Sequence, residues 1–195
     1  TRSGAMRWLR FTGTTGLRLR RARIMHEDVL KILARRSVRA FTAQPVPDAT
    51  LRDLLKAAMS APSAAARDPW HFIVVRNPVL LSRLAELLPH GTLIAHAAAG
   101  IVVCGDKQAA HRQDLSYLLQ DCSAATENLL LAASMMGLGA CWAGYVNMAI
   151  NESPAAKKFA GLSPRAAAGA VMMLGYPKYR YSRIPSRKPV KALWR

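Results

Sequence analysis

The segment RRSVR, residues 35–39, brings three arginines and a serine into five consecutive positions. Arginine presents a planar fork of donors that suits phosphate oxygens, and a serine hydroxyl adds one more donor. The nearest preceding acids, Glu27 and Asp28, lie most of two helical turns earlier. The segment therefore predicts an anion site, with phosphate as the ligand. The alternative is a solvated helix C-terminus, where cations favour the negative end of the helix dipole.

A second basic segment, SRIPSRKP at 182–189, lies near the other end of the chain. Two basic segments that are far apart in sequence can converge on one phosphate in a folded domain, and arginine suits such a site. We therefore treat the two segments as candidate halves of one anion site.

The common catalytic devices are missing from the sequence. No pair of carboxylates stands out, and neither GxGxxG nor GxxxxGK[ST] occurs. Cys104, Cys122 and Cys141 show neither CxxC nor Cys/His metal spacing, and the five histidines are scattered singly. The sequence therefore predicts no metal site and no Rossmann-type cofactor site. We expect the cysteines to be buried, reduced thiols in a cytoplasmic protein.

The chain is strongly basic, with 28 Lys and Arg against 11 Asp and Glu and a formal net charge of +17. Such a balance raises nucleic acid or an anionic membrane as a partner. Residues 1–24 hold seven arginines and no acid, and without them the net charge falls to +10. We expect a flexible basic extension there, with an organelle transit peptide as the alternative, ahead of one domain over 25–195. No apolar run reaches transmembrane length.

Helix-like and strand-like segments alternate from residue 25 onward. Capping residues help to define the helices, with Asn77 and Ser153 as N-caps and Gly137 as a C-terminal stop. The expected helices are 26–36, 49–61, 77–88, 114–136 and 153–160. The expected strands are 71–76, 99–105, 140–146 and 166–175. Strands separated by helices indicate an α/β or α+β layered domain, with 115–136 as its central buried helix.

Four stretches occur in an order that resembles the nitroreductase family of FMN-dependent oxidoreductases. They are RRSVRAF at 35–41, APSAAARDPWHF at 61–72, GLGACWAGY at 137–145 and LGYP at 174–177. The resemblance runs from about Ile32 to the end of the chain. It implies a three-layer α-β-α sandwich with a mixed central sheet, and a homodimer with FMN sites at the interface.

The resemblance also implies which residues hold the cofactor. Arg35, Arg36 and Ser37 would bind the FMN phosphate and the adjoining ribityl chain. Arg39 would reach the pyrimidine side of the flavin ring, where its charge can stabilise the anion that builds up on reduction. The C-terminal pair Arg187 and Lys188 would close on the phosphate.

Two further segments complete the implied site. Pro62, Ser63 and Ala64 match a loop that meets the cofactor of the second subunit. Cys141, Trp142, Ala143 and Gly144 match the segment whose backbone lies along the flavin ring near N5, where small residues permit close approach.

The chain departs from the family pattern in the first of these segments. The family often shows Asn at the position of Ala66 and Gln at the position of Asp68. Ala66 therefore lacks an amide for the flavin or ribityl chain, and Asp68 places an acid near an anionic cofactor. We expect these two positions to affect flavin affinity and redox tuning more than the fold.

The implied reaction has two steps: NAD(P)H delivers hydride to the flavin, and a small oxidant such as a nitroaromatic or quinone then takes the electrons. The sequence identifies no catalytic acid or base. One alternative is a flavin-binding protein of the same family with specialised chemistry, such as dehalogenation or flavin fragmentation, or with a sensing role. A more distant alternative is a nucleic-acid binder, against which stands the lack of a recognisable nucleic-acid-binding module.

Overall fold

The computed structural model describes residues 26–86, 92–143, 150–152, 154–159, 162–181, 184–186, 188–189 and 191–192. The expected basic extension at 1–24 lies outside the described residues, as do Gly144 and Arg187 of the predicted site and the predicted helix cap Ser153.

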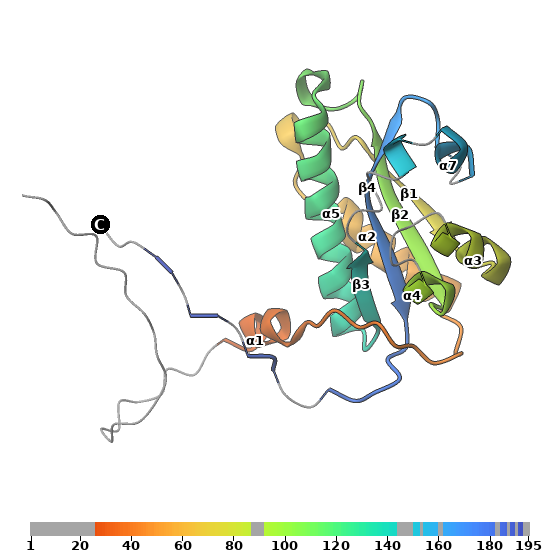
Figure 1. Ribbon diagram of the computed structural model, residues 1–195. Coiled ribbons are helices and arrows are strands. Elements are labelled where there is room, and N and C mark those ends of the chain that lie inside the picture. The colour runs from red at the N-terminus through yellow and green to blue at the C-terminus, as the bar shows by residue number, and fades with distance from the viewer. Residues whose placement is uncertain are drawn as a thin grey trace, which may run out of the picture.

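The centre of the fold is a four-stranded sheet (Figure 1). Its strands are β1 (Trp70–Val75), β2 (Ala99–Asp106), β3 (Gly139–Ala143) and β4 (Ala166–Gly175), in the order β1-β2-β4-β3. All three neighbouring pairs are antiparallel. The expected mixed sheet is therefore corrected: in the described residues, parallel pairing is limited to an isolated bridge between Ser37 and Ala140. The segment beside β3 meets that strand too briefly to become a strand itself.

Helices cover both faces of the sheet, so the expected three layers are confirmed. One core joins α2 (Asp48–Met59) and α5 (Leu115–Met135) to the face of β2 that carries Ile101 and Val103. The other core joins α3 (Pro78–Glu86) and α4 (Thr92–Ala95) to the face that carries Val102 and Cys104. Because successive strand residues point to opposite faces, β2, which is buried at every position from Ala99 to Gly105, serves both cores.

The central helix forms over almost the predicted range. The Asp114 carboxylate accepts a hydrogen bond from the Ser116 N–H at 2.7 Å and caps the start of α5. Gly137, with φ of 76°, follows the helix in the left-handed conformation that glycine adopts readily. Buried residues recur along α5 at helical spacing from Leu118 to Ala133.

The remaining helices agree with the sequence to within a few residues. Asn77 caps α3 as predicted, because its side-chain oxygen accepts from the Val79 N–H at 2.9 Å. The helix α7 spans Pro154–Phe159. The first helix, α1 (Glu27–Ala34), has no buried residue and ends before Arg35. Over the described parts of the chain, no helix is long and apolar enough to cross a membrane.

Candidate functional site

The arginine segment is held against β3 by its backbone. The Val38 N–H donates to the Ala140 carbonyl at 2.9 Å, and Ser37 forms the parallel bridge to the same residue. The Val38 side chain is buried over Gly139, where an added Cβ would lie 2.6 Å from Val38 Cγ1. Ser37 and Arg39, on either side of Val38, are exposed. Backbone pairing therefore fixes the segment and turns its polar side chains outward.

The chain that leaves β4 runs antiparallel beside this segment. The Thr42 N–H donates to the Tyr176 carbonyl at 2.9 Å, and the Lys178 N–H donates to the Ala40 carbonyl at 2.9 Å. Gly175 leaves room for Phe41, since an added Cβ there would lie 3.0 Å from its ring. The two ends of the domain thus meet at the predicted anion site.

The meeting point is a cavity of about 260 Å³ lined by Arg35, Arg36, Ser37, Arg39, Tyr181 and Pro185. We call these six residues the arginine corner. The guanidinium carbon of Arg36 lies 5.1 Å from the centroid of the Tyr181 ring, a cation–π contact that joins the two walls. Of the predicted C-terminal pair, Lys188 is exposed, and Arg187 lies outside the described residues.

An acid that the local sequence does not indicate lies at the arginine corner. Arg35 Nε is 3.6 Å from Glu127 Oε1, which projects from α5. The Arg35 side chain is 20% exposed, so it is not the solvated helix end of the alternative interpretation. Glu127 offsets part of the positive charge and helps to orient Arg35.

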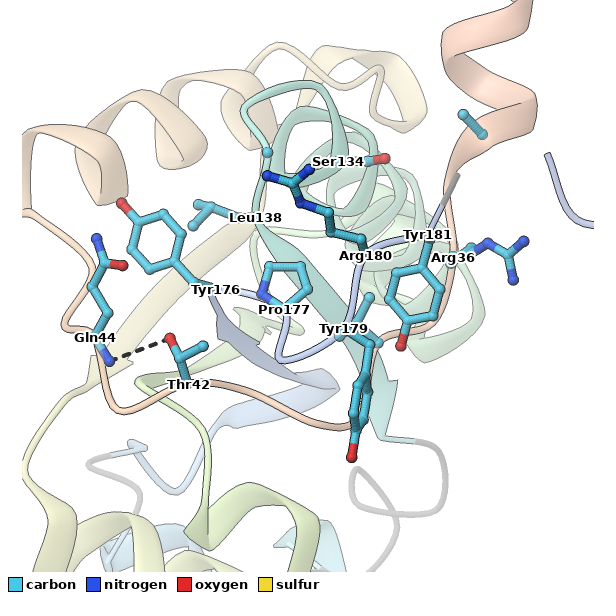
Figure 2. Close-up of a pocket in the computed structure, with 13 residues that line it drawn as sticks. Arg36, Thr42, Gln44, Ser134, Leu138, Tyr176, Pro177, Tyr179, Arg180 and Tyr181 are labelled. Carbon is cyan, nitrogen blue, oxygen red and sulfur yellow. Dashed lines mark hydrogen bonds between the residues drawn. The ribbon is translucent and has the colours of Figure 1, made fainter. Parts of the chain in front are cut away.

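A wider cleft of about 640 Å³ adjoins the arginine corner (Figure 2). Arg36 and Tyr181 line both spaces. The other polar and aromatic walls come from Thr42, Gln44, Ser134, Tyr176, Tyr179 and Arg180. The two spaces therefore adjoin at Arg36 and Tyr181, and together they leave room for a ligand larger than an isolated phosphate.

The predicted segment on β3 can contribute backbone more readily than side chains. Cys141 is buried in the core on the α3 face, Trp142 is 36% exposed and Ala143 is half-buried. Because β3 is an edge strand of the described sheet, its outer edge beyond Ala140 faces no other described strand. The Cys141 thiol points away from that edge into the core, so a direct contact from it to a ligand there is not expected.

The 61–68 loop is built from unusual backbone. Ala65, Ala66 and Asp68 have φ of 54°, 49° and 46°, in the left-handed region that non-glycine residues enter at a cost. The Ser63 hydroxyl donates to Asp68 Oδ1 at 2.5 Å and accepts from the Asp68 N–H at 2.9 Å. The Ala64 N–H donates to Asp121 Oδ1 on α5 at 2.9 Å. Pro62 and Ala66 are exposed.

The 61–68 loop does not line the arginine corner of its own chain. The loop leads into β1, whereas the corner lies beside β3, and these are the two edges of the sheet. Trp70 pairs with Gly105, which pairs with Ala167 on β4, while Ala140 pairs with Leu174. Those two β4 positions are separated by about 23 Å at the rise of an antiparallel strand. The predicted site residues therefore form two separate groups within one chain.

Sequence reasoning missed Asp121, Glu127 and Tyr181. The acid at 121 could have been noticed as a carboxylate in an apolar stretch of helix, but its contact with Ala64 depends on tertiary structure. The cysteines behave as predicted, since all three are free and buried. Burial raises the pKa of the Cys104 thiol to about 11 and that of Cys122 to about 12, with smaller contributions at Cys122 from Cys104 and Asp121.

Known proteins match most of this chain in sequence. The model of the nitroreductase family matches residues 32–92 and 88–176. A protein of Archaeoglobus fulgidus, whose assigned name is NADH dehydrogenase/NAD(P)H nitroreductase, is 40% identical over 154 residues, which are 79% of this chain and 87% of that protein.

Two solved structures extend the comparison to three dimensions. One, from Bacteroides thetaiotaomicron and with the same assigned name, has a TM-score of 0.74 and 34% identity, covering 84% of this chain and 93% of that one. The other is a protein of Desulfovibrio desulfuricans, with the assigned name nitroreductase, solved in complex with FMN. It has a TM-score of 0.72 and 31% identity, covering 83% of this chain and 93% of that one.

Proposed function

Because the chain belongs to the nitroreductase family, we propose that it is an FMN-dependent oxidoreductase that passes hydride from NAD(P)H to a small oxidant such as a nitroaromatic or quinone. The observation that carries this proposal is the arginine corner, where three arginines and a serine line one cavity. Relatives named as NAD(P)H nitroreductase and NADPH-flavin oxidoreductase support the reaction class.

The described residues fit the phosphate end of FMN. Arg35 and Arg36 offer planar donor forks and Ser37 offers a hydroxyl, all on one cavity wall. A phosphate would place almost two negative charges in this cavity, which three arginines line. Arg187 and Lys188 are proposed to close over it. The adjoining cleft leaves room beyond the phosphate.

The other residues are assigned by their positions around this anchor. Arg39 would lie at the pyrimidine edge of the ring, where a fixed positive charge stabilises the negative charge that develops there. The outer edge of β3 would lie along the ring, and the small side chain of Ala143 would permit close approach. FMN, once bound, supplies the hydride acceptance and delivery, so the protein needs to hold, orient and tune it.

We propose that two copies of the chain complete each site. No residue of the 61–68 loop lines the arginine corner of its own chain, and we propose that a second copy delivers this loop. Several apolar side chains on α1 and at the end of α5 are also exposed: Val29, Leu30, Ile32, Met135 and Met136. A helix with no buried residue gains most by packing on a partner. The three free, buried cysteines fit a reducing compartment such as the cytoplasm.

A visible absorption spectrum of the purified protein, followed by titration with FMN, tests the proposal. We expect a flavin spectrum, release of FMN on denaturation, and bleaching of the bound flavin by NADH or NADPH. Light scattering of the flavin-loaded protein should give a dimer. A protein that binds no FMN at micromolar concentration would contradict the proposed function, and a flavin-loaded monomer would contradict the shared site alone.

A further inference from the structure

Asp121 is an acid in the hydrophobic core. Its side chain lies on α5, is 4% exposed and is one of the buried residues of that helix. Its Oδ1 accepts the Ala64 N–H at 2.9 Å, while its Oδ2 is buried and has no hydrogen-bond partner among the described residues. Burial of a carboxylate is unfavourable unless its interactions compensate. The fold therefore keeps an unfavourable group at the place where α5 meets the 61–68 loop.

The 61–68 loop needs an anchor of this kind. Three of its residues have left-handed backbone without being glycine, so the loop would relax if it were free. The Ser63–Asp68 hydrogen bonds, and the one from the Ala66 N–H to the Ser63 carbonyl at 3.1 Å, lie within the loop itself. Among the hydrogen bonds that residues 62–68 form with other described residues, the one from Ala64 to Asp121 reaches another element, and the others stay within the loop.

We propose that Asp121 is a positioning residue for flavin binding: it holds the Ala64 amide and thereby presets the strained 61–68 loop that contacts the flavin of the other subunit. This inference rests on the proposed function. A carboxylate is a stronger acceptor for a backbone N–H than a neutral group, which suits it to hold an unfavourable loop conformation. A loop that is ordered before the ligand arrives costs less conformational entropy on binding.

The test compares two substitutions of similar size. Asp121→Asn can keep an oxygen acceptor for the Ala64 N–H, whereas Asp121→Leu fills the space and removes the acceptor. We expect Asp121→Asn to bind FMN within about threefold of the original protein and Asp121→Leu to bind it at least about tenfold more weakly. Riboflavin should lose the same factor as FMN in Asp121→Leu, because the loop would contact the ring and ribityl chain and not the phosphate.

Thr126→Val is the matched control. Thr126 is the other buried polar side chain on α5, and its hydroxyl donates to the Cys122 carbonyl of the same helix at 2.7 Å. This variant perturbs the same helix but not the loop, so its affinity for both ligands should be unchanged. Wild-type affinity for both ligands in Asp121→Leu would overturn the inference, and so would a loss of FMN affinity with riboflavin unaffected.

Hydrogen exchange of the Ala64 amide in the flavin-free protein separates this inference from the proposed function. Exchange should be faster in Asp121→Leu and slow in Asp121→Asn. If the original protein bound neither FMN nor riboflavin, the proposed function would be wrong. If the Ala64 amide were equally protected in all variants, the role of Asp121 in holding the loop would be wrong. Should Asp121→Leu not fold, Ala64→Pro removes the same hydrogen bond from the other side. Ser63 already has the extended backbone (φ −129°, ψ 157°) that a residue before proline needs.

Discussion

The arginine corner and the 61–68 loop lie at opposite edges of one sheet and are built in opposite ways. The corner collects charged side chains on a short segment that is pinned by its backbone to β3 and to the chain after β4. The loop has no basic side chain from 61 to 66 and consists of strained backbone tied to a buried acid. The difference suggests a division of labour: the corner recognises charge, and the loop provides shape. Each prediction below tests whether the two regions recognise different parts of one ligand.

The largest effect is expected from Arg36→Ala. Loss of a charge-assisted hydrogen bond to phosphate should weaken FMN about tenfold to a hundredfold. Riboflavin lacks the phosphate and should be bound about as before. Titration of the variant with FMN and riboflavin measures the difference. Equal losses of affinity for the two ligands would show that the phosphate does not bind at the arginine corner. We expect the same pattern for Arg187→Ala.

Arg39→Ala should act on reactivity more than on affinity. Its proposed partner is the reduced ring, so its loss should lower the flavin reduction potential and slow reduction by NAD(P)H on the order of tenfold. The affinity for oxidised FMN should fall by less than about threefold. Rapid-mixing kinetics and a potentiometric titration provide the two measurements. A large loss of affinity for oxidised FMN with an unchanged flavin reduction potential would show that Arg39, like Arg36, binds the phosphate.

Ala66→Asn tests the shape-providing region. Asn tolerates the left-handed backbone found at Ala66 better than Ala does, and it restores the amide common in the family. We expect FMN to bind about threefold to fivefold more tightly. Ala65→Asn is the control, because Ala65 has nearly the same φ of 54°. A gain at both positions would mean that loop stability, rather than a new contact, is responsible.

The smallest effect is expected from Glu127→Gln. Removing the carboxylate 3.6 Å from Arg35 leaves more positive charge for a phosphate, but the pair is partly exposed and therefore weak. FMN affinity should rise about twofold at low salt, and the gain should shrink as ionic strength rises. Weaker FMN binding in this variant would show that Glu127 mainly orients Arg35.

The two regions also differ in how far the sequence predicted them. The arginine corner could be anticipated, because three arginines and a serine within five positions form a dense set of donors for phosphate and are visible in the sequence itself. The loop conformation could not, since nothing in the letters PSAAARD signals three left-handed residues. Asp121 lies 57 positions from Ala64, and only the packing of α5 brings them together.

Local sequence signals predicted the helices and strands well, but they did not predict whether neighbouring strands run parallel or antiparallel. Asn77 and Gly137 mark helix ends through contacts within a few residues, so those boundaries were correct. Whether neighbouring strands run parallel or antiparallel depends on the path of whole connections. The helices α3 and α4 between β1 and β2 return the chain antiparallel, which alternation of helix and strand alone does not reveal.

Gly139 and Gly175 are paired across β3 and β4, and each is covered by a side chain of the segment that carries the arginines, Val38 over the first and Phe41 over the second. A methyl group at either position would push that segment away from the sheet while leaving the sheet's own hydrogen bonds in place. Neither glycine has any chemistry to offer a ligand. In a saturation library selected for catalysis, both positions should nevertheless be as intolerant as the arginines themselves, and a designer who transplants the arginine segment to another scaffold would have to carry this pair of vacant sites with it.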